Sequence, residues 1–217
     1  MTRRFEFTTH ELDAVERLLS TERLSTYMVE AKGDRKKAFY LYLYNRRLSS
    51  SLFECIGGLE VALRNSVHIT LSEAFQTDTW YDNLPFPWLR YEQAALQRAK
   101  EQLRSRNKQM PPGRIIAELT LGFWCGLTGK PYSTTLWIPH LHKAFPNKHL
   151  GRKDAYKRLN DIRELRNRIA HHECILHFDL QLEYDNILDS VDWICPITRS
   201  WIETHSSFLA ILRSRPV

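Results

Sequence analysis

Apolar residues recur every three or four positions along most of the chain, a pattern typical of helices with one buried face. No segment alternates apolar and polar residues between hairpin turns, so no strand is predicted. The chain therefore has the pattern of an all-α fold. In the N-terminal third, helices are expected over 9–19, from 20 or 21 to Gly33, and over much of 35–76, where Asp34 caps the helix. Further helices are expected over 91–106, 114–127, 154–169 and 187–212.

Glycine, proline and aromatic residues mark the expected interruptions. Gly57-Gly58 predicts either a kink in the long helix or a point where another helix approaches closely. Pro196 is a candidate break in the last helix, and 77–90 and 128–152 are predicted to be irregular. Because neither a repeat nor a linker interrupts the pattern, we expect one domain over 1–217. This domain is a helical bundle of long helices with a Pro/Gly/aromatic-rich middle region, and 1–35 forms an N-terminal helical extension.

Composition narrows the functional classes. The formal net charge is +6 and the pI about 9.2, which suits a nucleic-acid partner without requiring one. The 4 cysteines are scattered and form no C-x-x-C pair, which argues against a zinc site and a disulfide framework. We find no signal peptide and no apolar run long enough to span a membrane. We therefore expect a cytoplasmic protein with no membrane partner.

The helix from Asp154 onward carries the most informative polar residues. It buries a stripe that includes Leu165 and Ile169, and another face carries Arg163, Asn167 and His171. His171 follows Arg166 by five positions, which places the two side chains about 140° apart on an ideal helix. They can act on one phosphate if Arg166 curls round, if the helix ends near Ala170, or if two copies of the segment meet at a dimer axis.

Arginine and histidine together can cleave RNA without a metal ion. A histidine with an ordinary pKa of about 6.5 gives and takes protons near neutrality. An arginine fork grips phosphate oxygens and stabilises a pentacoordinate phosphorus. The spacing by itself arises by chance in a chain of this composition. The structural alternative is that Arg166 pairs with an acid on a neighbouring helix while His171 caps the helix end.

A family resemblance gives the pattern more weight. Arg166-Asn167-x-x-x-His171 resembles the Arg-Asn-x-x-x-His signature of the HEPN superfamily of helical ribonucleases, and 165–173 resembles its Abi-like (abortive infection) family. Three further blocks resemble that family in the same order: Leu59-Glu60-Val61-Ala62-Leu63-Arg64-Asn65, then Glu118-Leu119-Thr120-Leu121-Gly122-Phe123-Trp124 with Leu127, then Leu136-Trp137 and Phe145-Pro146. Together the blocks span roughly 40–180.

The resemblance implies a compact HEPN-like bundle that forms a homodimer, with paired Arg and His side chains facing across the axis and RNA as substrate. It also implies a bacterial defence setting, with an antitoxin or defence-system partner. His171 would act as general acid and base, Arg166 would stabilise the phosphorane, and Asn167 would orient the phosphate or His171. Some HEPN toxins carry a tyrosine two positions after the histidine as a modification site. Glu173 stands there in this chain, which puts that mode of neutralisation in doubt.

Other residues are expected to support this site. The basic run that includes Lys157, Arg158, Arg163 and Arg168 would hold the RNA strand. Glu60 is either the i,i+4 ion-pair partner of Arg64 or a group that orients Arg64 or Arg166. Arg64-Asn65 with His68 repeats the Arg/Asn/His chemistry on the earlier helix, and His172 can hold the ring of His171.

Two further readings stay open. The chain could be a non-catalytic RNA-binding or regulatory HEPN module, or a scaffold whose dimer interface contains the motif. His140, His142 and His149 lack a carboxylate or cysteine at ligand spacing, so we predict neither a metal site nor a cofactor. Phe123 and Trp124 are expected in the core.

Overall fold

The protein is described by a computed structural model that covers residues 7–106, 109 and 111–216. The described residues contain helices and no strand, which confirms the all-α fold. Among them, no helix combines the length and apolar content needed to cross a membrane. The α-helices are α1 (Thr9–Leu19), α2 (Thr21–Glu30), α3 (Arg35–Phe75), α4 (Arg90–Ser105), α5 (Pro112–Glu118), α6 (Leu121–Leu127), α7 (Arg152–Ala170), α8 (Leu180–Asp192), α9 (Pro196–His205) and α10 (Phe208–Leu212).

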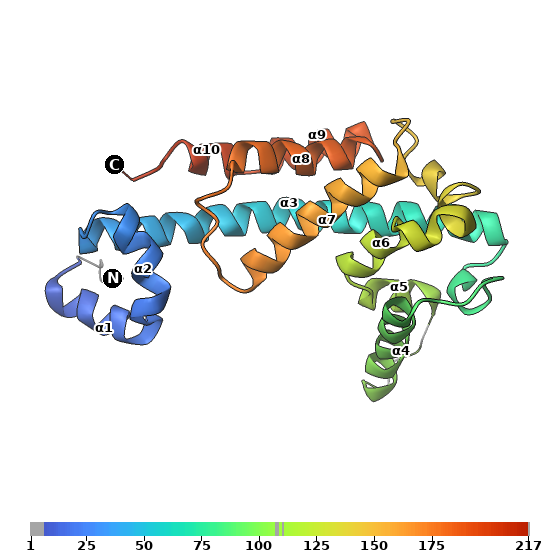
Figure 1. The fold of residues 1–217 in the computed structure, drawn as a ribbon, viewed down its shortest axis with the longest axis horizontal. Helices are drawn as coiled ribbons and strands as arrows, with labels where there is room; N and C mark the ends of the chain where they lie inside the picture. Colours follow the sequence, from blue (N-terminus) through green and yellow to red (C-terminus); the bar gives the residue numbers. More distant parts are fainter. Residues whose placement is uncertain (1–6, 107–108, 110, 217) are drawn as a thin grey trace.

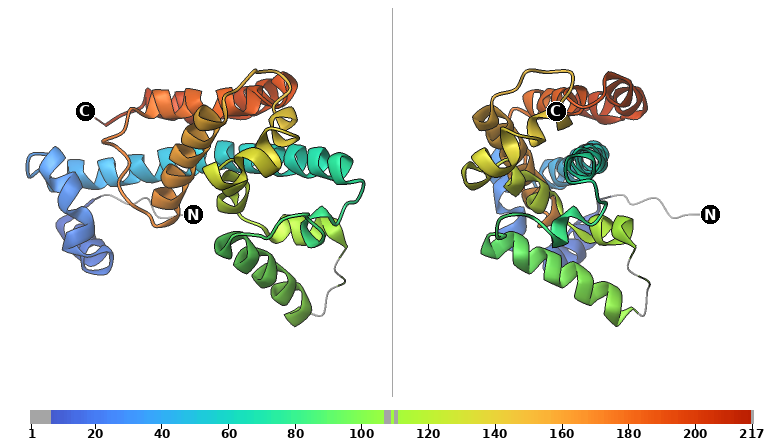
Figure 2. Two further views of the ribbon diagram at one scale, coloured as in Figure 1. Left: turned by 45° about the vertical axis from the view of Figure 1, so that its right-hand side comes forward. Right: turned by 90° about the vertical axis from the view of Figure 1, so that its right-hand side faces the viewer.

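Helix α3 is the axis of the structure (Figure 1). Helices α8, α9 and α10 line one side of it, α4 and α5 project from the other, and α7 crosses it obliquely, as the turned views in Figure 2 also show. The helix begins where the Asp34 side chain accepts a hydrogen bond from the Lys37 N–H, which confirms the predicted cap. Its 41 residues extend over about 60 Å.

The Gly57-Gly58 pair does not interrupt α3, which runs as one helix from Arg35 to Phe75. The second expectation, close approach of another helix, is confirmed at Gly58. A Cβ built there would lie 2.6 Å from Cδ1 of Ile202 on α9. A Cβ at Gly57 would meet nothing within 4 Å. Only the second glycine is therefore required by packing.

The helix predicted over 114–127 is wrong as a single element. The structure forms α5 and α6, separated by Leu119 and Thr120 in extended conformation. The buried apolar residues of this stretch would fall on every side of one straight helix, and such a helix could not direct them all into the core. The break lets both short helices do so. The residues concerned are Ile115, Ile116, Leu119, Leu121, Phe123, Trp124 and Leu127.

The C-terminal region breaks twice. The candidate break at Pro196 is confirmed, because α9 begins there, and a second break at Ser206 and Ser207 separates α10. Two segments contain only short helical turns. The segment between α3 and α4 has one at Trp80–Asp82, and the segment between α6 and α7 has three, at Lys130–Tyr132, at Ser133–Trp137 in π conformation and at Leu141–Ala144. The irregular middle region is thus confirmed.

The N-terminal extension has its own small core. Side chains of α1 and α2 pack against the first turns of α3 in a cluster separate from the main one. Leu12, Leu24 and Tyr27 are buried in it beside Phe39 and Leu41. This packing holds the α1–α2 hairpin against the same end of α3 that receives the end of α7.

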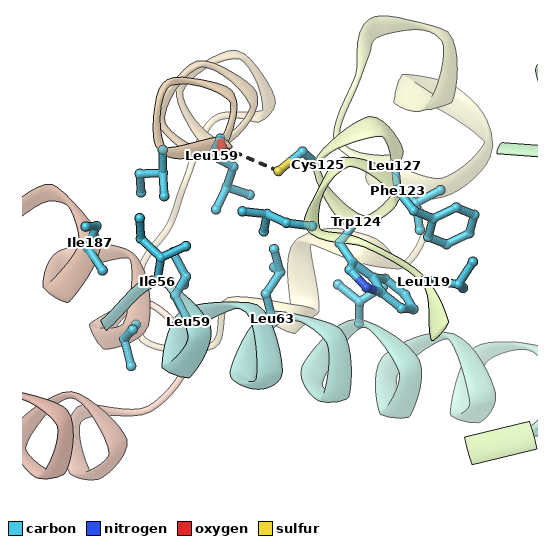
Figure 3. Packing of buried hydrophobic residues seen from close by; sticks show 14 of the residues in the cluster. Ile56, Leu59, Leu63, Leu119, Phe123, Trp124, Cys125, Leu127, Leu159 and Ile187 are labelled. Atoms are coloured by element: carbon cyan, nitrogen blue, oxygen red, sulfur yellow. Dashed lines mark hydrogen bonds between the residues drawn. The ribbon is translucent and has the colours of Figure 1, made fainter. Parts of the chain in front are cut away.

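The main core fixes the position of α7. Leu159 of α7 packs near Leu59 and Leu63 of α3, and the Cys125 thiol of α6 donates a hydrogen bond to the Leu159 carbonyl over 3.4 Å (Figure 3). The predicted buried stripe of α7 is confirmed, since Ala155, Leu159, Ile162, Leu165 and Ile169 are all buried. Phe123 and Trp124 are fully buried, as expected.

Candidate functional site

The motif segment lies at the C-terminal end of α7. The helix ends at Ala170 with His171 as its cap, so one of the three geometric alternatives is realised within the single chain. The His172 N–H donates to the Ile169 carbonyl, and the Glu173 N–H donates to the Arg168 carbonyl over 2.9 Å. These two bonds form a Schellman motif, in which the residue at the position of His172 adopts a left-handed conformation. His172 has φ 57°, a conformation that costs about 1 kcal/mol or more outside glycine.

Two residues from distant elements hold this turn. The buried side chain of Asn45 on α3 accepts a hydrogen bond from the Ile175 N–H over 2.9 Å and donates one to the Glu173 carbonyl over 3.3 Å. Arg23 of α2 donates to the His172 carbonyl over 2.8 Å. The turn that carries His171 is therefore held by hydrogen bonds from the N-terminal half of α3 and from the N-terminal hairpin.

Sequence reasoning missed both of these clamps. A signal for Asn45 was present, because Asn45 falls on the same helical face as Leu41, Leu48 and Leu52. A polar residue inside a buried apolar stripe needs hydrogen-bond partners, which makes it a candidate structural anchor. Arg23 had no comparable signal, since it is one arginine among many on an exposed face.

Arg166 has no acidic partner among the described residues. Its guanidinium carbon lies 5.6 Å from the ring centre of Phe53 on α3, and its buried Nε has no hydrogen-bond partner. The structural alternative for Arg166, a pair with an acid on a neighbouring helix, is therefore wrong. The other half of that alternative holds, because His171 is the cap residue of α7. A partly buried, unneutralised guanidinium favours an anionic ligand.

Asn167 and His171 lie close to Arg166 along the chain, but no hydrogen bond links the three side chains. His171 is exposed and Asn167 half-buried. Neither side chain has a hydrogen-bond partner among the described residues, so His172 does not hold the ring of His171. One chain thus presents an arginine, an amide and a histidine at one helix end without locking them together.

The predicted RNA-contacting cations occupy three different environments. Lys157 is exposed and has no ion pair in the described part of the chain. Arg163 donates to Asn160 and Glu164, and Arg168 pairs with Glu173 over 3.0 Å. Such exposed pairs contribute about 1 kcal/mol or less, so RNA phosphates can compete for these arginines.

Arg158 faces α8 instead. Its guanidinium carbon lies 5.7 Å from the ring centre of Trp193, and its Nη1 is buried without a hydrogen-bond partner. Burial raises the pKa of Glu183 on α8, and the charge of nearby Arg158 opposes that rise. Arg158 therefore contributes to the packing of α7 on α8, on a side of the helix different from that of Arg163.

The earlier motif block, Leu59–Asn65, lies in the part of α3 whose buried residues pack with those of α6 and α7. Burial raises the pKa of the Cys125 thiol to about 12; the charge of Arg163 opposes this rise and that of Glu60 adds to it. Glu60 and Arg163 therefore both lie near Cys125 of α6. No ion pair joins Glu60 to Arg64 or Arg166 among the described residues, so neither predicted pairing forms. Arg64 instead donates to the Asn65 side chain over 3.3 Å.

His68 has a structural role. The Trp80 indole N–H donates to His68 Nδ1 over 3.0 Å, so this nitrogen must be unprotonated. Burial also lowers the pKa of His68. The histidine is thus held neutral in the aromatic cluster beside α3, and it does not repeat the chemistry proposed for His171.

Of the three histidines weighed as metal ligands, His149 is exposed, and His140 and His142 make packing contacts. His140 lies edge-on to Phe75, and His142 Nδ1 bonds to the Trp137 carbonyl over 3.0 Å. Within the described ranges, no three His, Cys, Asp or Glu side chains are grouped as metal ligands.

Comparison of the chain with family models, curated proteins and solved structures finds no match. The resemblance to the Abi-like family therefore stays a prediction that rests on the motif residues.

Proposed function

We propose that the protein is a metal-independent endoribonuclease of the HEPN type, with Arg166, Asn167 and His171 at its active site. The observation that carries the proposal is the environment of Arg166. An arginine that is partly buried, stacked on Phe53 and without an acidic partner is prepared to bind a phosphate. An exposed histidine stands at the end of the same helix.

The chemistry follows from these groups. A neutral His171 takes the proton of a ribose 2′-OH, and the 2′-oxygen attacks the adjacent phosphorus. Arg166 stabilises the extra negative charge of the phosphorane. A protonated histidine gives its proton to the departing 5′-oxygen. The products are a 2′,3′-cyclic phosphate and a 5′-hydroxyl, and DNA is inert because it lacks the attacking hydroxyl.

The reaction needs both a base and an acid, and the Arg-Asn-x-x-x-His motif supplies one histidine per chain, His171. We therefore propose a homodimer in which two copies of the turn face each other across a two-fold axis. From the family resemblance we further propose that the enzyme acts in the bacterial cytoplasm as an abortive-infection or toxin-type defence protein, with an antitoxin or another defence component as restraining partner.

The test is cleavage of single-stranded RNA by wild type and by two variants. His171→Ala and Arg166→Ala should each lower the cleavage rate by at least about 100-fold, since each removes a group that acts in the transition state. EDTA should leave the rate unchanged, and the products should carry cyclic phosphate. The matched control is His177→Ala, an exposed histidine six residues further on, which should cleave like wild type. Full activity of His171→Ala, or loss of activity in EDTA, would refute the proposal.

A second candidate is a non-catalytic RNA-binding module on the same fold. It is favoured by one observation: no described group fixes the ring of His171, whereas catalytic histidines are usually oriented by a partner. RNA binding without turnover, unaffected by His171→Ala, would select this alternative.

A further inference from the structure

A groove of about 700 Å³ lies beside the turn that carries His171. It is bounded by the C-terminal end of α7, by the N-terminal half of α3 and by the N-terminal hairpin. Ala170 and His172 line it from α7 and its turn, Phe53 and Arg46 from α3, and Arg23 from α2. Ligand pockets of about 300–1,000 Å³ enclose molecules of the size of a nucleotide.

The groove is electropositive. Arg23 and Arg46 line it together with His172, and no acidic residue is among the described side chains that do so. Arg46 is exposed and makes no ion pair in the described chain. Arg23 uses only Nη1 for its bond to the His172 carbonyl, so most of its five N–H donors stay available. Such a surface attracts an anion.

The groove also offers an aromatic surface and small polar groups. Phe53 as a residue is 42% exposed although the Arg166 guanidinium packs on its ring. Ser49 and Ser50 line the wall beside it. An unpaired base can stack on an aromatic ring of this kind, and hydroxyl groups can bond to base edges or to a 2′-hydroxyl. An acidic peptide would satisfy the arginines without using the ring.

We infer that this groove binds the nucleotide next to the scissile phosphate, with its phosphate on Arg23 and Arg46 and its base on Phe53. The inference rests on the proposed function for the position of the scissile phosphate. It gives the N-terminal hairpin a role in the site, because α2 supplies one phosphate ligand and holds the turn with the same side chain.

The test is binding of an uncleavable single-stranded octamer of 2′-fluoro RNA, measured by fluorescence anisotropy. Arg46→Gln should weaken binding about threefold to tenfold and reduce the salt dependence by about 0.7 in the log–log slope, as expected for one lost phosphate contact. Phe53→Leu should weaken binding about fivefold or more, and Phe53→Tyr should bind like wild type. Arg47→Gln is the matched control, because Arg47 is the next residue on α3, is exposed, and does not line the groove.

The outcomes separate this inference from the proposed function. If wild type cleaves ordinary RNA through His171 while Arg46→Gln and Phe53→Leu bind the octamer like wild type, the groove assignment alone is overturned. If the two variants lose binding while wild type cleaves nothing, the groove assignment stands and the nuclease proposal fails. Three other outcomes would overturn the groove assignment. Arg46→Gln and Arg47→Gln could lose equal affinity for the octamer, a glutamate-rich decapeptide could bind the wild type as tightly as the octamer does, or the wild type could fail to bind the octamer. Melting temperatures within about 2 °C of wild type show that each variant is folded.

Discussion

The clamp formed by Asn45 offers a direct test of how the motif turn is held. Asn45→Leu replaces an amide that is 3% exposed by an apolar side chain of similar size. The substitution removes two hydrogen bonds and leaves the Ile175 N–H and the Glu173 carbonyl without their side-chain partner. No second partner for the buried Ile175 N–H is present among the described residues.

The magnitude follows from the two bonds. A lost hydrogen bond costs about 1 kcal/mol, and a buried donor left unsatisfied costs about 1–3 kcal/mol. The apolar side chain recovers part of this by burial. We expect the free energy of unfolding to fall by about 2–4 kcal/mol, which for a domain of this size lowers the melting temperature by about 4–16 °C.

Urea denaturation followed by circular dichroism measures the change. Asn65→Leu is the matched control, since Asn65 is an exposed asparagine on the same helix whose side chain bonds only to neighbouring Arg64. It should change the stability by less than about 0.5 kcal/mol. If Asn45→Leu were as stable as the control, the two hydrogen bonds would not hold the turn, and the clamp would be refuted.

Two further predictions concern α3. Gly57→Ala should stabilise the protein by about 0.5–1 kcal/mol in urea denaturation, because alanine favours the helix and nothing lies within 4 Å of the new Cβ. Gly58→Ala should lose this gain and up to about 2 kcal/mol more, because its Cβ would press on Ile202. Equal stabilities of the two variants would contradict the contact between Gly58 and Ile202. The lowered pKa of His68 means that the unfolded chain binds the proton first, so stability should be full above about pH 6.5 and fall as the pH drops below it. His68→Gln should reduce this loss between pH 7.5 and 5.5, and an unchanged pH profile would show that the bond from Trp80 does not keep the ring neutral.

The candidate site could be predicted in part. The position of Arg166 and His171 at one helix end follows from the local sequence, because the apolar stripe of α7 stops with Ile169. Which arginines remain free for RNA does not follow. Arg158, Arg163 and Arg166 look alike in the sequence, yet one packs on Trp193, one pairs with Glu164, and one stacks on Phe53.

The sequence by itself determined the helical class, the Asp34 cap, the break at Pro196 and the buried stripe of α7. Each of these depends on residues within a turn or two of one another, so local propensity and periodicity are sufficient. Only the tertiary structure decided the split at Leu119, the partner of Gly58 and the clamps on the motif turn. Asn45 and Arg23 lie 128 and 149 positions from the residues that they bind. Such contacts depend on how the helices pack around one core, which no local pattern records.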